Sequence, residues 1–251
     1  RRDPSGEPID PVLAVADGKV VYRTRVGATS GYGQYIVIEH LWESAPYYSL
    51  YAHLNRIDVS ESQNVRQGEQ IGLLGYTGTG INKARAHLHF EINLFLSTYF
   101  ERWHSEFFPS KTNHHGVFNG INLAGFDVAS FYLEHNKNPS LTPAQFLSRL
   151  TPHFTVRVPA IQPPQVARRY PWMAPQRLTS RTGAWDVSFD SSGLPLKVVP
   201  SPSSVQAPVI VSIRQTGAPH RLVTRNLVQG AGSQASLTDG GTRLIRLLFM
   251  E

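Results

Sequence analysis

The stretch from Arg85 to Leu94 alternates strictly between polar and apolar side chains, and this pattern constrains the fold more than any other. The polar side chains are those of His87, His89, Glu91 and Asn93. Successive side chains of a β-strand point to opposite faces, so the stretch predicts a strand with one buried and one open face. Two histidines two positions apart then point the same way. Such a pair can bind one metal ion, or divide the work between a ligand and a proton carrier.

Four earlier segments give this strand a context. In chain order they are VLAVADGKVV at 12–21, GYGQYIVIEH at 31–40, YSLYAHL at 48–54 and VRQGEQIGLLGYTGTG at 65–80. The series resembles the lysostaphin/LytM-type zinc metallopeptidases, whose sequences contain P-V-x-A-x-x-D-G-x-V, Y-G-x-x-V-x-I-x-H, Y-x-H-L, V-x-x-G-x-x-I-G and H-L-H-F-E in this order. The resemblance covers roughly residues 10–95.

The resemblance implies a zinc endopeptidase that cuts peptide cross-links of peptidoglycan or of similar envelope peptides, in the periplasm or outside the cell. In that family a His and an Asp of an early H-x-x-x-D motif and the second His of H-x-H bind the zinc. Carried over by motif, His89 is a zinc ligand. His87 and His53 become the paired histidines that move protons and stabilise the oxyanion.

The chain departs from the family in lacking an H-x-x-x-D motif. Counted back from Pro11, the aspartate falls at Asp3 and its histidine before Arg1. Alternatively, residues 3–10 are an insertion after the motif and both ligands precede Arg1, which is the interpretation we prefer. The chain then reads as a piece of a longer precursor. Either way it supplies at most two of three ligands, so we expect weak zinc binding or none. If the chain nevertheless binds zinc tightly, Asp3, Asp10 and His40 are the first candidates for the missed ligand.

The remaining histidines are interpreted as structural or exposed. His40 matches the family pattern as a strand-end residue, and we expect a satisfied structural histidine. His114 and His115 are expected to be a solvated loop pair rather than part of the cleft. Four more have no partner in the sequence, namely His104, His135, His153 and His220.

Composition excludes several classes of protein. The formal net charge of +6 and the pI near 9.7 suit an anionic partner or surface, but there is no block of consecutive basic residues, so nucleic acid is not expected. The absence of cysteine excludes disulfides and thiolate chemistry. No apolar run reaches the roughly 20 residues that span a bilayer, so no membrane span is expected.

The predicted fold class is mainly β: a compact antiparallel peptidase-like core, a helical extension and a small C-terminal β module. The predicted domains are a metallopeptidase core at 1–97, the extension at 98–158, a Pro-rich linker at 159–180 and the β module at 181–251. Turn signals at Asp17-Gly18 favour a hairpin there. Helices are expected at 98–108, 127–134 and 142–150, and C-terminal strands at 185–189, 194–199, 209–213, 221–228 and 242–249.

Two other classes of function remain open. A degenerate, non-catalytic member of the family would keep the groove and regulate another cell-wall hydrolase. An interaction protein built on the Pro-rich and C-terminal regions would account for those segments but not for the histidines. An H-x-x-x-D motif directly upstream of Arg1 in the gene would favour the enzyme, and its absence would favour the binding module.

Overall fold

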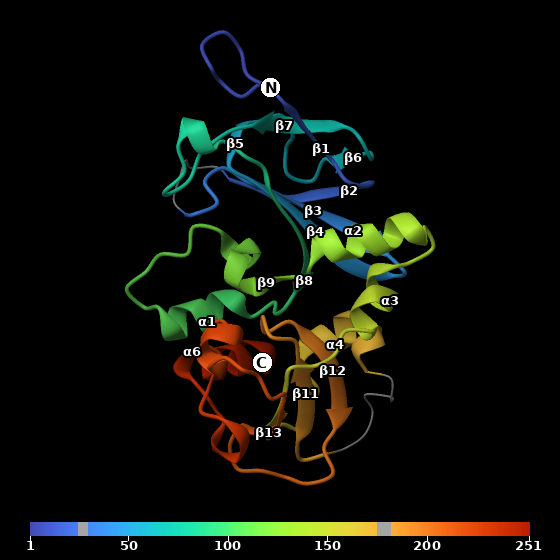
Figure 1. Cartoon of the computed structure of the whole chain (residues 1–251), viewed down its shortest axis with the longest axis vertical. Helices are drawn as coiled ribbons and strands as arrows, with labels where there is room; N and C mark the ends of the chain where they lie inside the picture. Colours follow the sequence, from blue (N-terminus) through green and yellow to red (C-terminus); the bar gives the residue numbers. More distant parts are fainter. Residues whose placement is uncertain (25–29, 175–181) are drawn as a thin grey trace. The chain divides into compact units, whose positions relative to one another are not determined.

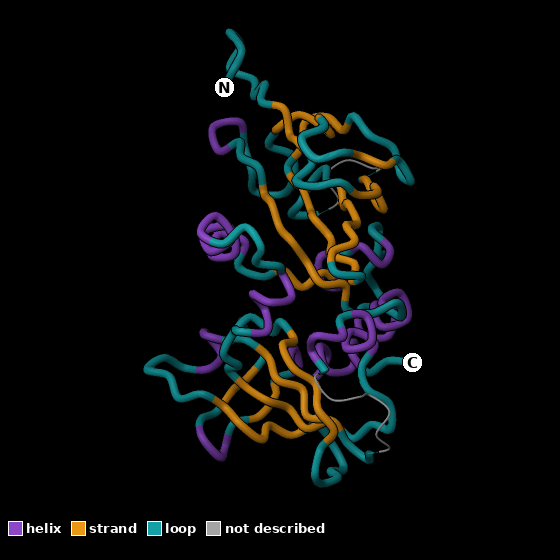
Figure 2. The backbone as a smooth tube through the Cα atoms, turned by 90° about the vertical axis from the view of Figure 1, so that its right-hand side faces the viewer, coloured by secondary structure: helices purple, strands orange, loops and turns teal. Residues whose placement is uncertain are grey.

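A computed structural model describes residues 1–24, 30–174 and 182–251. The chain divides into two compact units (Figure 1). Unit 1 contains residues 1–95 and 114–126, and unit 2 contains 96–113 and 127–251. In Figure 2 each unit has its own set of strands. Every pairing between described strands is antiparallel, which confirms the predicted mainly β fold class.

The larger sheet of unit 1 has six strands in the order β6-β2-β3-β4-β8-β9. Its strands are β2 (Gly18–Arg23), β3 (Ile36–Trp42), β4 (Ala45–Ala52), β6 (Asn64–Val65), β8 (His89–Phe95) and β9 (Leu123–Gly125). In β4 the register pairs Ala52 with His89 of β8. This pairing brings the end of β4 beside the start of β8, where the candidate histidines lie.

A three-stranded sheet accompanies it, with the order β1-β7-β5. Its strands are β1 (Pro11–Leu13), β5 (Leu54–Ile57) and β7 (Gln70–Leu74). Apolar side chains of both sheets form one buried cluster, with Val12, Leu54 and Ile71 from the smaller sheet and Ile38 and Tyr51 from the larger. Leu88 and Phe90 pack against this cluster, as the alternation predicts. Burial of these side chains supplies the main driving force for joining the two sheets.

The opposite face of the six-stranded sheet is also buried. Tyr35, Val37 and Leu50 of that face form a second cluster, to which Leu123 contributes, and Val117 and Phe118 pack against it. The covering segment contains the short helices η2 (Gly116–Phe118) and η3 (Gly120–Asn122) and leads into β9. Residues 114–126 thus return to unit 1 after the chain has left it at Phe95.

Two local predictions in unit 1 are wrong. Asp17-Gly18 makes no hairpin, because β1 pairs with β7 while β2 pairs with β3 and β6. Asp17 is held instead by contacts distant in sequence, since its carboxylate accepts the N–H of Gln67. The strand expected from Arg85 begins only at His89, because Asn82 caps the short helix η1 (Lys83–Arg85), its side chain accepting the Arg85 N–H.

Unit 2 combines helices with a four-stranded sheet in the order β12-β11-β10-β13. The strands are β10 (Phe154–Val158), β11 (Trp185–Phe189), β12 (Pro195–Pro200) and β13 (Val209–Ile213). The three predicted helices are present as α1 (Phe100–Phe107), α2 (Val128–Lys137) and α3 (Pro143–Ser148). Asp127 caps α2, and Thr142 opens α3 with a capping box.

The C-terminal part differs from its prediction. The strand expected at 242–249 is the helix α6 (Asp239–Leu248), capped by Thr238, and it buries Ile245, Leu247 and Leu248. A short apolar run fits either element by periodicity alone, and here the cap and the helical spacing decide. The strand expected at 221–228 is replaced by α5 (His220–Val223) and the two-stranded pair β14 (Val228–Gln229) and β15 (Ser236–Leu237).

The region predicted as an extended linker contains the helix α4 (Gln165–Arg169) and the turn η4 (Pro171–Met173). Val166, Tyr170 and Met173 are fully buried there, so this part packs into unit 2. Residues 175–181 of the predicted linker and module lie outside the described residues.

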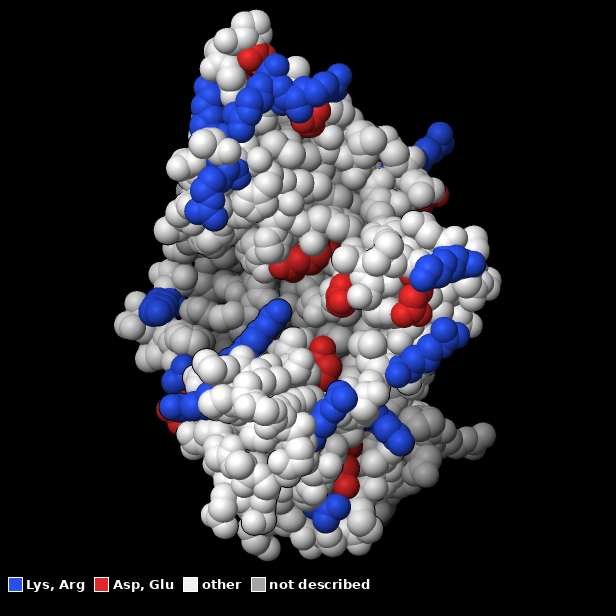
Figure 3. Space-filling view, viewed as in Figure 1, with Lys and Arg blue, Asp and Glu red and all other residues white. Residues whose placement is uncertain are grey.

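The described helices are all too short or too polar to cross a membrane. On the face shown in Figure 3, Lys and Arg side chains are spread over both units, with a group near the N-terminal end of the chain.

Candidate functional site

His53 occupies the point where the chain passes from one sheet of unit 1 to the other. It lies between the last residue of β4, Ala52, and the first residue of β5, Leu54. Its φ of 62° is in the left-handed region, which costs a non-glycine residue about 1–2 kcal/mol. Its N–H donates to the Tyr32 carbonyl at 2.9 Å, which fixes this conformation. Backbone strain that the surroundings impose on a polar residue is typical of functional sites.

Two glycine-containing loops approach each other closely beside His53, and one of them carries the Thr77 carbonyl that the His53 ring contacts. A Cβ atom on Gly33 would lie 2.3 Å from the Thr77 carbonyl carbon, and one on Gly78 would lie 2.4 Å from the Gly31 oxygen. Both glycines also have positive φ, of 61° and 107°. Only glycine fits at these positions. The contact places the Thr77 carbonyl 2.8 Å from Nδ1 of His53.

Hydrogen bonding sets the tautomers of His53 and His87. A carbonyl can only accept, so Nδ1 of His53 donates its proton to Thr77, and Nδ1 of His87 donates to the Arg85 carbonyl at 2.7 Å. In the neutral ring Nε2 is then the unprotonated, basic nitrogen. Burial lowers the pKa of His53, and the neighbouring His87 and His89 lower it further against the opposing effect of the Thr77 bond. His53 is therefore a neutral base near pH 7.

His89 is held by a carboxylate. Its Nε2 lies 2.6 Å from Oε1 of Glu91, which also accepts the Tyr32 hydroxyl at 2.9 Å. This hydrogen bond raises the pKa of His89 although burial opposes it. Burial also opposes the ionised form of Glu91, but hydrogen bonds from His89, Tyr32 and Asn93 outweigh it and lower the pKa of Glu91 overall. Glu91 is thus an ionised anchor that fixes the orientation of the His89 ring.

The three histidines singled out by the sequence lie together. The His53 ring centroid is 4.8 Å from that of His87 and 5.7 Å from that of His89. His89 starts β8, whereas His87 is exposed in the turn that precedes it. Their assigned roles, with His89 as ligand and His53 and His87 in proton transfer, stay predictions.

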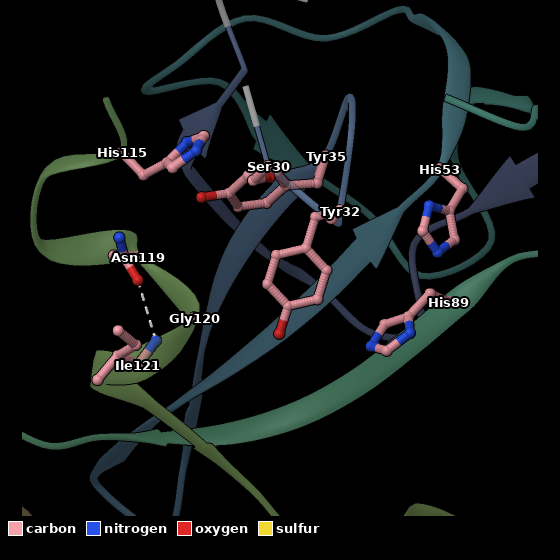
Figure 4. A pocket seen from close by; sticks show the side chains of 10 residues that line it. Ser30, Tyr32, Tyr35, His53, His89, His115, Asn119, Gly120 and Ile121 are labelled. Atoms are coloured by element: carbon pink, nitrogen blue, oxygen red, sulfur yellow. Dashed lines mark hydrogen bonds between the residues drawn. The ribbon is translucent and has the colours of Figure 1, made fainter. Parts of the chain in front are cut away.

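A cavity of about 440 Å³ opens beside His53 and His89. Figure 4 shows the two histidines on one side, residues 119–121 on the other, and Tyr32 between them. Its lining consists of Ser30, Gly31, Tyr32, Tyr35, His53, His89, His115, Asn119, Gly120 and Ile121. This volume is within the range of small-ligand sites.

His115 departs from its prediction as a solvated loop residue, whereas His114 is exposed as expected. His115 is 7% exposed, lines the cavity, and its Nδ1 lies 2.8 Å from the Tyr22 hydroxyl. No local pattern in the sequence indicates this contact, because Tyr22 is 93 positions away. Tyr32 and Glu91 were likewise given no role, although both fall in segments that match the family pattern. Their signal was the polar side of the alternating strand and the Tyr-Gly turn before β3.

The donors among the described residues do not make up a three-ligand zinc site. Within residues 1–24, 30–174 and 182–251, no group of three or more His, Cys, Asp or Glu side chains can hold a metal ion. The three residues considered above as candidate ligands, Asp3, Asp10 and His40, make other interactions. Asp3 accepts the Glu7 N–H within its own turn, and Asp10 pairs with the amino group of Arg1. Both ring nitrogens of His40 are hydrogen-bonded.

His40 is confirmed as a structural histidine. It is fully buried, its Nδ1 donates to the Asp17 carbonyl at 2.8 Å, and its Nε2 accepts from the Ser49 hydroxyl at 2.7 Å. Burial lowers the pKa of His40, although the Asp17 carbonyl opposes this. No ring nitrogen remains for chemistry.

Comparison with known proteins places the chain. The family model described as Peptidase family M23 matches residues 3–99. Lipoprotein NlpD of Yersinia enterocolitica is 38% identical over 90 residues, which are 36% of this chain and 84% of that protein. The chain belongs to peptidase family M23. The resemblance inferred from the sequence motifs is thereby confirmed.

Two further similarities describe the extent of the match. Murein hydrolase activator NlpD of Escherichia coli (strain K12) is 40% identical over 90 residues, covering 36% of this chain and 21% of that protein. The chain thus spans about a fifth of the length of the first curated relatives it matches. A zinc-containing peptidase from Vibrio cholerae, solved by crystallography, is 34% identical, covers 37% of this chain and 30% of that chain, and has a TM-score of 0.28.

Proposed function

We propose that this M23 protein acts on the peptides of bacterial peptidoglycan and cleaves them as an endopeptidase. The observation that carries the proposal is the convergence of His53, His87 and His89 beside a cavity, with Nε2 of His53 and of His87 left as the basic nitrogens. In His40, which we interpret as structural, both ring nitrogens are hydrogen-bonded instead. A protein that only binds peptide does not require two neighbouring bases.

The chemistry assigned to the chain's own residues is acid–base catalysis of amide hydrolysis. A water molecule attacks the peptide carbonyl, and Nε2 of His53 or His87 takes up one of its protons. The carbon–nitrogen bond then breaks, and the imidazolium returns the proton to the leaving amine. The other imidazole stabilises the charge that develops on the carbonyl oxygen only when its Nε2 also carries a proton, because the ring must donate a hydrogen bond to that oxygen. The left-handed backbone of His53 and the Thr77 carbonyl hold one base rigidly in position.

Zinc is the cofactor proposed from the family. Of the donors in this chain we propose His89 as a ligand, through Nδ1, because its Nε2 bonds Glu91. The described residues do not complete a three-donor site, and the weak zinc affinity expected of this chain stays a prediction.

The second candidate function is a binding module that regulates another cell-wall hydrolase. Two observations favour it: the described residues lack a three-donor metal group, and relatives such as the Escherichia coli protein are named murein hydrolase activators. Other relatives are named lipoproteins or cell division proteins. We propose a location in the cell envelope, periplasmic or extracellular, for either function.

Purified peptidoglycan labelled with a covalent dye, incubated with the protein as its gene encodes it, separates the two functions. An endopeptidase releases dye into the supernatant, and the release increases when zinc is supplied at micromolar concentration. A binding module sediments with the sacculi and releases no dye itself at any zinc concentration. When an envelope amidase is added, the module increases the dye that the amidase releases. Absence of both sedimentation and release would contradict both functions.

A further inference from the structure

The segment that precedes the peptidase core folds into a closed turn. Arg2 and Pro8 pair as an antiparallel bridge. Between them the Asp3 N–H donates to the Glu7 carbonyl at 2.9 Å, and the Asp3 carboxylate accepts the Glu7 N–H at 2.8 Å. These bonds give the segment a defined shape, and we call residues 2–8 the N-terminal turn.

The N-terminal turn holds Lys83, the first residue of η1, by both its main chain and its side chain. Nη2 of Arg2 donates to the Lys83 carbonyl at 2.7 Å. Nζ of Lys83 donates to the Ser5 carbonyl at 2.7 Å and lies 2.7 Å from Oε1 of Glu7. Hydrogen bonds from charged donors are stronger than neutral ones, but the Lys83 side chain is 39% exposed, so each contact alone contributes modestly. The turn therefore fixes η1 through several contacts together.

The short helix η1 transmits this placement to His87. The Arg85 N–H, at the end of η1, donates to the Asn82 side chain at 3.2 Å. The Arg85 carbonyl accepts the hydrogen bond from Nδ1 of His87 at 2.7 Å. His87 is exposed, so its ring depends on this bond more than a buried ring would. A continuous series of contacts thus leads from the N-terminal turn through Lys83 to a proposed catalytic base.

We propose that Lys83, held by the N-terminal turn, is a positioning residue that sets the orientation of the His87 ring. The proposal rests on the proposed function for the role of His87 in proton transfer, whereas the orientation itself can be measured without activity. A misplacement of a catalytic group by about 1 Å can lower a rate by about 10²-fold. Loosening a partly exposed contact at one remove should cost less.

Turnover tests the consequence of this positioning. Lys83→Met removes Nζ and keeps an unbranched side chain. In the protein as its gene encodes it, kcat on soluble cross-linked muropeptide dimers should fall by about 3–10-fold, while KM stays within about twofold. Arg66→Met is the matched control, because it removes one positive charge from an exposed side chain of the same unit. It should leave both constants unchanged.

A double-mutant cycle assigns the effect to the contact with the turn. Glu7→Gln alone should lower kcat less than Lys83→Met does, because the Ser5 and Arg2 contacts of Lys83 remain. In the Lys83→Met background, Glu7→Gln should cause no further loss, because its partner has already been removed. Independent, additive losses would mean that the two residues do not act through this ion pair.

The tautomers of the histidines report the orientation directly. Side-chain ¹⁵N NMR of the whole 251-residue chain at pH 8 distinguishes Nδ1–H from Nε2–H rings, and both His53 and His87 should carry the proton on Nδ1. In Lys83→Met the Nδ1–H fraction of His87 should fall. His53 is the internal control, because its Nδ1 bonds the Thr77 carbonyl, and its tautomer should not change. A general loss of stability would not change one ring alone.

The outcomes separate this inference from the proposed function. An unchanged His87 tautomer in Lys83→Met overturns the inference, as does a large rise in KM at constant kcat, which would make Lys83 a substrate contact. If the wild type and Lys83→Met cleave at the same rate, the inference fails and the proposed function stands. If the wild type cleaves nothing but the His87 tautomer changes, the proposed peptidase fails and the positioning of His87 by Lys83 stands. Thermal melting confirms that each variant folds.

Discussion

Each unit contains a pair of adjacent imidazoles, and the two pairs differ in what surrounds them. In unit 1 the His53 and His87 ring centroids are 4.8 Å apart, and His53 lines a cavity. In unit 2 the His153 and His220 centroids are 5.7 Å apart, and both residues are buried. There Nε2 of His153 and Nδ1 of His220 have no hydrogen-bond partner within the described part of the chain.

The comparison shows that neighbouring imidazoles do not by themselves make a catalytic site. His53 and His87 each have Nδ1 fixed by a carbonyl and the basic nitrogen left open, which is a geometry suited to proton transfer. Both histidines of the unit 2 pair are buried, and their unpartnered nitrogens are a cost to stability. The first pair is expected to affect turnover and the second to affect stability.

The largest expected effect is a loss of turnover when His53 or His87 is replaced. His53→Asn should lower peptidoglycan cleavage by about 10²–10⁴-fold, because asparagine accepts the left-handed backbone but carries no base. His87→Ala should lower it over a similar range. Dye release from labelled peptidoglycan, in the protein as its gene encodes it, measures both. Full activity in both variants would show that His53 and His87 take no part in the mechanism.

Removing His89 should act differently from removing the bases. His89→Ala is expected to abolish cleavage and reduce bound zinc together, because it removes the proposed ligand, whereas His53→Asn and His87→Ala should leave bound zinc largely unchanged. Metal analysis of the purified proteins, each in the form that its gene encodes, gives the readout. Zinc that is lost in His87→Ala but kept in His89→Ala would mean that the two roles are reversed.

His40 provides the contrasting case in the same sheet. His40→Ala should lower the free energy of unfolding by about 2–4 kcal/mol, because it leaves a cavity and an unpaired Ser49 hydroxyl and Asp17 carbonyl. The cleavage rate of the folded fraction should stay the same. Urea unfolding followed by tryptophan fluorescence measures the loss. A variant with native stability but greatly reduced turnover would give His40 a catalytic role and weaken the contrast.

A smaller change, at the hydrogen-bond partner of His40, refines that result. Ser49→Ala removes only the hydroxyl that Nε2 of His40 accepts from, and it should cost about 1–2 kcal/mol without affecting cleavage. The same unfolding experiment applies. A loss as large as that of His40→Ala would indicate that Ser49, rather than the packing of the imidazole, dominates the stability of this site.

The smallest expected effect is a pH dependence from the second pair. Burial lowers the pKa of His153, and the adjacent His220 and Arg214 lower it further, while Asp190 opposes them. Below the unfolded-state pKa of about 6.5 the unfolded chain binds more protons, so this contribution favours unfolding as the pH falls towards the folded-state pKa. His153→Gln should flatten the dependence of unfolding free energy on pH below about pH 6.5. An identical slope in the wild type would contradict this assignment.

Much of the site could be predicted from the sequence because its signals are local. The alternation around His89 follows from the period of a strand, and the order of the motifs gave the family. The cap residues Asp127 and Thr142 likewise predicted where the helices α2 and α3 begin. Each of these features depends on residues a few positions apart.

The features that were missed depend on contacts between distant residues. The burial of His115 needs Tyr22, and the passage of Asp17-Gly18 between two sheets depends on pairings with β7 and β3. The approach of Gly120 to Tyr32 joins residues that are 88 positions apart in the sequence (120 − 32 = 88). No local pattern encodes these contacts, so the return of residues 114–126 to unit 1 could be found only in the fold.

The most direct test of the account is mass spectrometry of purified cross-linked muropeptide dimers incubated with the protein as its gene encodes it. The account predicts that the dimers are converted to fragments whose masses sum to that of the dimer plus one water molecule. It also predicts no such products with His53→Asn and normal products with the folded fraction of His40→Ala. Dimers that bind the wild type but stay intact, with and without zinc, would contradict the peptidase and establish the binding module in its place.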